Sequence, residues 1–242
     1  TMQSLKTIKI CTSLAIVLLT FFVLSDVAVA GPGGIIKEAG KTFWGKIIMG
    51  GILLFFAPLI TWYLLKRAIL VRKTRQLLKQ IALSDSRFEW MELKDRVTQV
   101  FLWVHSAWDQ KKMDIAEQYV TDWYRQNQQL LLDKWDRDGL ENKVSDVAIK
   151  KITPLYVAQN IKDDSKNRLV VEIEAEMRDH MITKDTGKII QGDKRLGTVT
   201  TIWSFVWQQN NWQLNLIEAG DMDMEYLSEP NKVYALDEGT AA

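Results

Sequence analysis

Several carboxylates, three of them at alternate positions of one segment, could in principle form an acid–base catalytic site. Glu172, Glu174 and Glu176 lie in RLVVEIEAEMRD, and Asp109 and Asp114 precede them in the chain. A catalytic carboxylate needs burial or a like-charged neighbour to shift its pKa. In a strand, the three glutamates would share the polar face at spacings of about 6 to 7 Å. We therefore interpret them as a solvated face rather than as an acid–base site.

Histidines and glycines do not form a recognisable site either. His105 and His180 have no Cys or His partner at the spacing of metal ligands. The segments GKII at Gly187 and GDKRLG at Gly192 lack the strand, loop and helix of a phosphate-binding loop, so we expect hairpin turns there. No nucleophile, base and orienting group can be assembled from the spacing. The sequence therefore predicts no enzymatic activity, no cofactor and no metal.

Tryptophan is abundant, with 10 residues in the chain. Core packing accounts for most of them, because each aromatic side chain buries roughly 150 to 250 Å². Alternation along residues 201–207 places three aromatic side chains on one face, which could line a pocket for a lipid tail, a hydrophobic peptide or a partner side chain. Trp103 lies off the main apolar face of its helix and could contact a partner. The candidate pocket and partner residues are Trp103, Trp108, Trp123, Trp203, Phe205 and Trp207.

Two helices are predicted to position the first of these residues. Helical spacing of apolar side chains predicts one helix from near Phe88 to near Trp108. A second helical pattern follows residues 109–112 and ends before Gly139, a natural stop. The side chains expected to point inward from the second helix are Ala116, Tyr119, Val120, Trp123, Leu130 and Leu131.

Beyond Gly139 the hydrophobic period changes from about 3.6 to 2, which predicts strands. Turns are expected at 163–165, 185–187 and 209–211. Helices followed by antiparallel strands indicate an α+β domain with helices packed on one sheet face. The strand candidates are Val144–Ile161, Leu169–Ile182, Val199–Gln208 and Trp212–Ile217.

These motifs in this order resemble the Tim44-like domain family. The resemblance covers residues 88–219 and is carried by Val100 to Asp114, which includes HSAWDQKKMD, and by TIWSFVWQQNNWQLNLIE. It implies a cystatin-like or nuclear-transport-factor-like cone with a large apolar pocket, and a scaffold rather than a catalyst. The mitochondrial scaffold of the family is held at its membrane peripherally, whereas this chain has a predicted span in that place.

Two apolar segments precede the domain. The first follows Lys6 and Lys9 and leads to residues 28–30, Ala-Val-Ala, which is typical of a secretory signal. We therefore expect a signal peptide, or an uncleaved signal anchor, over residues 1–30. The only cysteine, Cys11, lies inside it, so a processed chain would have no thiol chemistry.

The second apolar segment, residues 47–65, contains no ionisable side chain and is long enough to cross a bilayer. A buried soluble helix is the alternative. A short periplasmic segment, residues 31–46, would precede this transmembrane helix. Three Lys lie on its N-terminal side and six cations on its C-terminal side, and cytoplasmic flanks carry the excess of Lys and Arg. This bias predicts a single span after signal cleavage and a cytoplasmic C-terminal domain. The resemblance, whose family includes bacterial membrane-anchored relatives, implies the bacterial inner membrane as the location.

Residues 66–87 predict a basic amphipathic helix next to the membrane, with a solvated linker helix as the alternative. Its cations are expected to attract anionic lipid headgroups. Residues 84–86, Ser-Asp-Ser, would end it. The candidate membrane-surface residues are Lys66, Arg67, Arg72, Lys73, Arg75 and Lys79.

Charge is divided along the chain. Residues 1–76 hold ten Lys or Arg and two Asp or Glu, a balance of +8, and the remainder holds 21 and 28, a balance of −7. An acidic domain argues against nucleic-acid binding. We expect residues 220–242 to be an acidic, flexible tail.

Together these features predict a membrane-anchored scaffold or adaptor that recruits partner proteins, with membrane-protein transport or biogenesis as the implied theme. The protein partner and the oligomeric state are open. One alternative is a protein, or an enzyme, that binds a lipid or small hydrophobic ligand in the cone. Another is a secretion-system component with a periplasmic domain.

Overall fold

The structure, a computed structural model, describes residues 43–234. The predicted signal sequence and most of the predicted periplasmic segment therefore lie outside the described residues. The chain forms two compact units that divide between Trp62 and Tyr63. The helix α3, Phe43–Ala82, contributes to both. From Lys46 to Ala82 it is long and apolar enough to cross a membrane, and no residue in its most apolar 18-residue window is buried.

The helices of the second unit start at capping residues. Asp85 caps η1, Ser86–Phe88, by accepting from the Arg87 amide, so residues 84–86 do separate two helices. Glu89 caps α4, Trp90–Asp109, which confirms the first predicted helix to within two residues. The turn η2, Met113–Tyr119, follows. Thr121 then caps α5, Asp122–Arg137, by accepting from the Tyr124 amide, and Gly139 follows with a φ of 70°.

The predicted inward face of the second helix is partly wrong. Trp123 is 56% exposed and Leu130 is 64% exposed, whereas Tyr124 and Leu132 are buried. The sequence pattern predicts one continuous helix from residue 116 onward. Extended backbone at Val120 and Thr121 breaks that pattern, because the Thr121 amide donates to the Leu214 carbonyl of the sheet. The helix therefore restarts at a new phase.

The strands form one five-stranded sheet in the order β4-β3-β2-β1-β5. All neighbours are antiparallel except β1 and β5, so the α+β class is confirmed. Gln209 and Asn210, both with positive φ, make the β3–β4 turn. The strands are β1 Leu140–Asn160, β2 Arg168–Thr183, β3 Ile189–Gln208, β4 Asn211–Ala219 and β5 Lys232–Tyr234.

The prediction of a hairpin turn at GDKRLG is wrong, because this segment lies inside β3. Gly192 pairs with His180 of β2 and has a φ of 78°. A Cβ at Gly192 would lie 2.3 Å from the Asp179 carbonyl oxygen. The glycine therefore allows a positive φ and a close approach of the β2 backbone inside a strand, rather than a turn. Gly187, in contrast, does lie in the β2–β3 turn.

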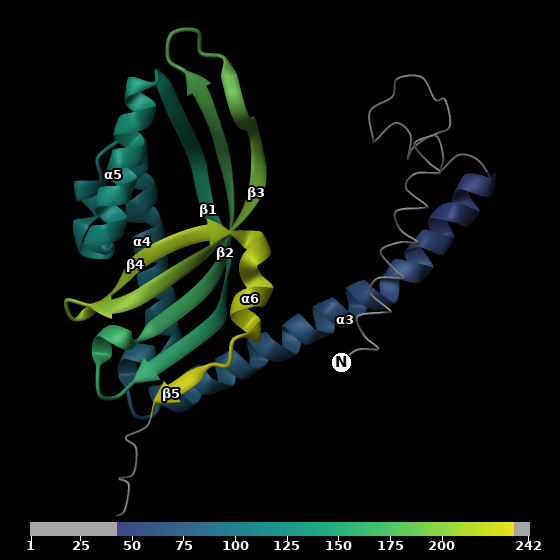
Figure 1. Cartoon of the computed structure of the whole chain (residues 1–242), viewed down its shortest axis with the longest axis horizontal. Coiled ribbons are helices and arrows are strands. Elements are labelled where there is room, and N and C mark those ends of the chain that lie inside the picture. The colour runs from purple at the N-terminus through teal and green to yellow at the C-terminus, as the bar shows by residue number, and fades with distance from the viewer. Residues whose placement is uncertain (1–42, 235–242) are drawn as a thin grey trace, which may run out of the picture. The chain divides into compact units, whose positions relative to one another are not determined.

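Helices cover both faces of the sheet (Figure 1). On one face, α4 and α5 pack over the main core, which includes Phe101, Trp203 and Phe205. On the other face, the C-terminal part of α3 and the short helix α6, Asp223–Ser228, pack over a second core. Buried apolar residues of the second core are Val71, Leu155, Tyr156, Ala158, Val170, Ile202 and Leu227.

The described part of the predicted flexible tail is ordered, so that prediction is wrong for residues 220–234. They form the turn η4, Gly220–Met222, then α6 and β5. Acidic composition suggested solvation, but Leu227 is buried in the second core and Asp223 is buried beside a cation. Residues 235–242 lie outside the described residues.

Candidate functional site

The juxtamembrane part of α3 packs on its own domain. Val71, Thr74, Leu78 and Ile81 are buried, and the Thr74 hydroxyl donates to the Leu155 carbonyl at 3.1 Å. The apolar stripe that suggested a membrane-surface helix is Ile69, Leu70, Leu77, Leu78 and Ile81. Leu78 and Ile81 are buried, Leu70 and Leu77 are partly buried against the cores, and Ile69 is exposed. Most of that stripe therefore covers the sheet of the domain, which corrects both the lipid-facing apolar stripe and the solvated linker helix.

Arg67 is an internal ion-pair partner rather than a free membrane-surface cation. Its Nη2 lies 2.6 Å from Glu172 Oε2, and its Nε lies 2.7 Å from Asp223 Oδ2. Tyr63 donates to both Asp223 oxygens at 3.3 Å. Glu172 is 8% exposed, which corrects the interpretation that it stands on a solvated strand face. Sequence periodicity missed this because α3 and α6 cover the polar face of β2.

The other predicted membrane-surface residues keep outward positions in most cases. Arg72, Lys73, Arg75 and Lys79 are exposed on α3, and Lys66 is partly buried. No ion pair joins the four exposed cations to another described residue. They lie opposite the buried stripe, so this helix presents one apolar face to the sheet and one basic face to its surroundings.

Three of the candidate pocket residues are buried or partly buried in the main core. Trp203 is 1% exposed and Phe205 is fully buried. The Trp203 ring lies 5.2 Å from that of Phe101. Trp207 is partly buried and packs edge-on against Trp212 at 5.6 Å. The face predicted to line a pocket is therefore filled by other side chains.

A narrow cleft lies beside Trp108, next to a wider cleft lined mostly by the charged residues Lys111, Asp133, Asp136 and Arg137. The narrow cleft has a volume of about 20 Å³, near that of one water probe, so it is too small to be the large apolar pocket that the resemblance implied. The apolar lining of the narrow cleft includes Trp108, Leu132, Trp135 and Val144. The Trp108 indole N–H is buried there without an acceptor in the described part of the chain.

His105 lies within the aromatic part of the core. Its ring lies 4.1 Å from Phe101 and 6.1 Å from Trp203, nearly parallel to the latter. Burial lowers the pKa of His105, although the Phe101 carbonyl, 2.8 Å from Nδ1, and Asp179 act in the opposite direction. His105 is therefore a neutral packing residue. Among the described residues, no cluster of His, Cys, Asp or Glu could hold a metal ion.

Trp103 and Trp123 are the candidate residues that stay on the surface, with 41% and 56% exposure. Trp103 stacks on Tyr119 at 5.4 Å, and the Arg96 guanidinium lies 4.8 Å from the same tyrosine ring. Arg96 donates to the carbonyls of Trp212 and Gln118, both at 2.9 Å. These bonds hold the stack in place, so Trp103 presents a rigid aromatic surface.

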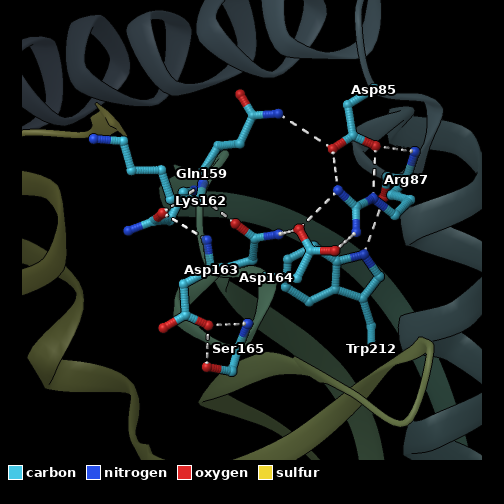
Figure 2. Close-up of polar contacts among 10 residues, drawn as sticks. Asp85, Arg87, Gln159, Lys162, Asp163, Asp164, Ser165 and Trp212 are labelled. Carbon is cyan, nitrogen blue, oxygen red and sulfur yellow. Dashed lines mark hydrogen bonds and ion pairs between the residues drawn. The ribbon is translucent and has the colours of Figure 1, made fainter. Parts of the chain in front are cut away.

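Sequence reasoning missed a polar junction centred on Arg87 (Figure 2). Arg87 binds Asp85 at 2.8 Å and Asp164 at 2.6 Å, and its guanidinium lies 5.0 Å from the Trp207 ring. These contacts lower the pKa of both carboxyls. The Arg87 carbonyl accepts from Trp212 Nε1 at 3.0 Å. The junction joins η1 to the β1–β2 connection and to the β3–β4 hairpin, so its role is to hold these segments together.

The sequence profile of the Tim44-like domain matches residues 74–219. This match includes α4, α5 and strands β1 to β4, and it spans more than half of the chain. The chain belongs to the Tim44-like domain family. The Tim44-like domain begins earlier than the predicted residue 88 and takes in the end of α3. Curated protein sequences give no match.

Two solved structures show a distant similarity to this chain. The intermembrane space region of the chloroplast protein ARC6 is 13% identical, covering 48% of this chain and 90% of that one, with a TM-score of 0.33. A proposed polyketide cyclase from Xanthomonas campestris pv. campestris is 11% identical, covering 50% and 90%, with a TM-score of 0.27.

Proposed function

We propose that this chain is a bacterial inner-membrane scaffold that recruits or organises partner proteins through its Tim44-like domain. The observation that carries the proposal is the division of α3. Its apolar part is uncovered along its most apolar window, whereas its C-terminal part belongs to the core of the domain. Anchoring would raise the effective concentration of the domain for membrane-bound partners. Transport or biogenesis of membrane proteins is the theme that the family suggests.

The proposed orientation places the domain in the cytoplasm. With Arg67 set aside as an internal ion-pair partner, five cations still follow residues 47–65, against Lys37, Lys41 and Lys46 before them. The excess supports a cytoplasmic C-terminal side. The exposed cations of α3 would then lie near anionic headgroups of the inner leaflet. The family's cystatin-like or nuclear-transport-factor-like cone is the proposed finer class of the domain.

Cysteine labelling tests this topology. In a Cys11→Ala background, Lys188→Cys marks an exposed position of the domain, and Glu38→Cys marks the other side of the span. A membrane-impermeant thiol reagent applied to cells with a permeabilised outer membrane should label Glu38→Cys and leave Lys188→Cys unlabelled until lysis. Labelling of Lys188→Cys in intact cells would contradict the proposal and favour the periplasmic secretion-system alternative.

Exposed aromatic residues are the proposed partner contacts, because Trp and Tyr dominate binding hot spots. Photo-crosslinking from Trp103 and Trp123 in intact membranes should capture a partner, and Lys94, also exposed on α4, serves as the control position. Equal capture from all three positions would argue against a specific surface. The ligand-binding or enzymatic alternative would need a cavity, and the filled core around Trp203 gives it less support.

A further inference from the structure

Two segments that flank the Tim44-like match pack against each other. Residues 63–73 precede the match and residues 220–231, here called the C-terminal strap, follow it. Arg67 pairs with Asp223, and Val71 shares the second core with Leu227. Inside the match, Thr74 accepts from Asn231 Nδ2 at 3.0 Å. The strap therefore holds the juxtamembrane part of α3 on the sheet.

Few contacts attach the strap. The helix α6 has only six residues, too few to be stable alone. Leu227 is its buried apolar side chain. Met222, Met224 and Tyr226 are only partly buried where they pack against the second core. The polar attachments are Asp223 to Arg67 and Tyr63, Tyr226 to Glu218, and Asn231 to Thr74 and to the Val157 amide. Segments with few buried apolar contacts open locally at a lower free energy than the whole domain.

Charge at the attachment point is unbalanced. One guanidinium, Arg67, serves two carboxylates, Glu172 and Asp223, whose side chains are 10% and 7% exposed. With the strap closed, these three groups sum to one negative charge in a partly buried site. With the strap open, Arg67 keeps Glu172 as a balanced pair, and Asp223 returns to water. Glu172 and Asp223 therefore compete for the same cation.

We propose that the C-terminal strap is a latch that opens as a unit while the main core stays folded, with Arg67 as the group that sets how often it opens. Opening uncovers part of the second core, which includes Val71, Leu155 and Ile202. The chain then has an apolar surface that is available only in the open state. This inference does not depend on the proposed orientation or on the identity of a partner.

Hydrogen exchange of the full chain in nanodiscs tests the latch, because exchange reports local opening. In the unmodified chain, amides of residues 223–231 should exchange faster than those of residues 97–104 in α4. Equal protection of the two segments would overturn the proposal, because the strap would then open only by global unfolding.

Two charge variants should change the frequency of strap opening in opposite directions. Asp223→Asn removes the ion pair of the strap, so opening should become about tenfold more frequent. Glu172→Gln removes the competitor and gives Arg67 to Asp223 alone, so opening should become less frequent by a similar factor. Shifts in the same direction for both variants would contradict the competition for Arg67.

Arg67→Met removes the shared cation and leaves two carboxylates facing each other. The strap should then lose most of its protection, while residues 97–104 keep theirs. Arg72→Met is the matched control, because Arg72 is exposed on the same helix. If Arg67→Met lowers protection in α4 as much as in the strap, Arg67 is a global stability residue and the latch is rejected.

Discussion

At the scale of single residues, His105 connects burial to a measurable pH dependence. Its pKa is lowered in the folded chain, whereas an unfolded His titrates near pH 6.5. The unfolded chain therefore binds more protons just below that pH, and folding stability falls as the pH falls from about 7 toward 5. One such group contributes a slope of at most about 1.4 kcal/mol per pH unit.

His105→Phe should flatten this slope, because the ring is retained and the titrating group is removed. Urea denaturation at pH 5, 6 and 7, followed by tryptophan fluorescence, measures the slope in both chains. An unchanged slope in the variant would assign the pH dependence to other groups.

Gly192 gives a second prediction at this scale. Gly192→Ala combines a positive φ with a Cβ 2.3 Å from the Asp179 carbonyl oxygen, so it should destabilise the domain by about 1 to 3 kcal/mol. Gly197→Ala, in the same strand with open space around the Cβ, should cost less than about 1 kcal/mol. Thermal unfolding of the two variants compares them, and equal losses would refute the role given to the positive φ and the close backbone approach at Gly192.

Single-residue roles were predictable where local pattern decided them. Asp85 as a cap and Gly139 as a stop follow from their types and neighbours. Arg67 and Glu172 do not, because their contact joins residues 105 positions apart. Arg67 also belongs to the excess of cations that follows the apolar segment, which is the usual sign of a cytoplasmic membrane flank, so sequence alone could not separate the two roles.

At the scale of elements, substitutions in the second half of α3 can show whether its apolar stripe covers the sheet or faces lipid. Leu78 is 1% exposed and Leu83, just beyond the helix, is 90% exposed. Leu78→Ala should lower the free energy of unfolding by about 2 to 5 kcal/mol, as for other buried leucines. Leu83→Ala should change it by less than about 0.5 kcal/mol. Chemical denaturation in detergent measures both, and a small effect of Leu78→Ala would mean that the stripe faces lipid.

Elements of the main core were predictable because helix capping and strand alternation act locally. The phase of α5 was missed because a sheet contact at Thr121 interrupts the pattern. The strap was missed because its order depends on contacts with α3. Its own composition is that of a solvated tail.

At the scale of the whole molecule, the basic face of α3 should bind anionic membranes. Each cation near the surface contributes about 1 kcal/mol, so four would strengthen binding by two to three orders of magnitude at low salt. Changing Arg72, Lys73, Arg75 and Lys79 to Gln in the fragment 63–242 should remove most of this affinity for phosphatidylserine vesicles, as measured by co-sedimentation. This fragment is one compact unit, and the four residues are exposed, so its fold should be retained.

The matched control changes the same amount of charge elsewhere. Lys94, Lys134, Arg137 and Lys188 are exposed on the helices and the hairpin, and their change to Gln should leave vesicle binding within about threefold. Both variants lose the same net charge, whereas only the first loses the basic face of α3. If both variants lose affinity alike, net charge governs the attraction and the α3 face is not the membrane surface. Neutral vesicles should bind neither variant, because the attraction depends on anionic headgroups.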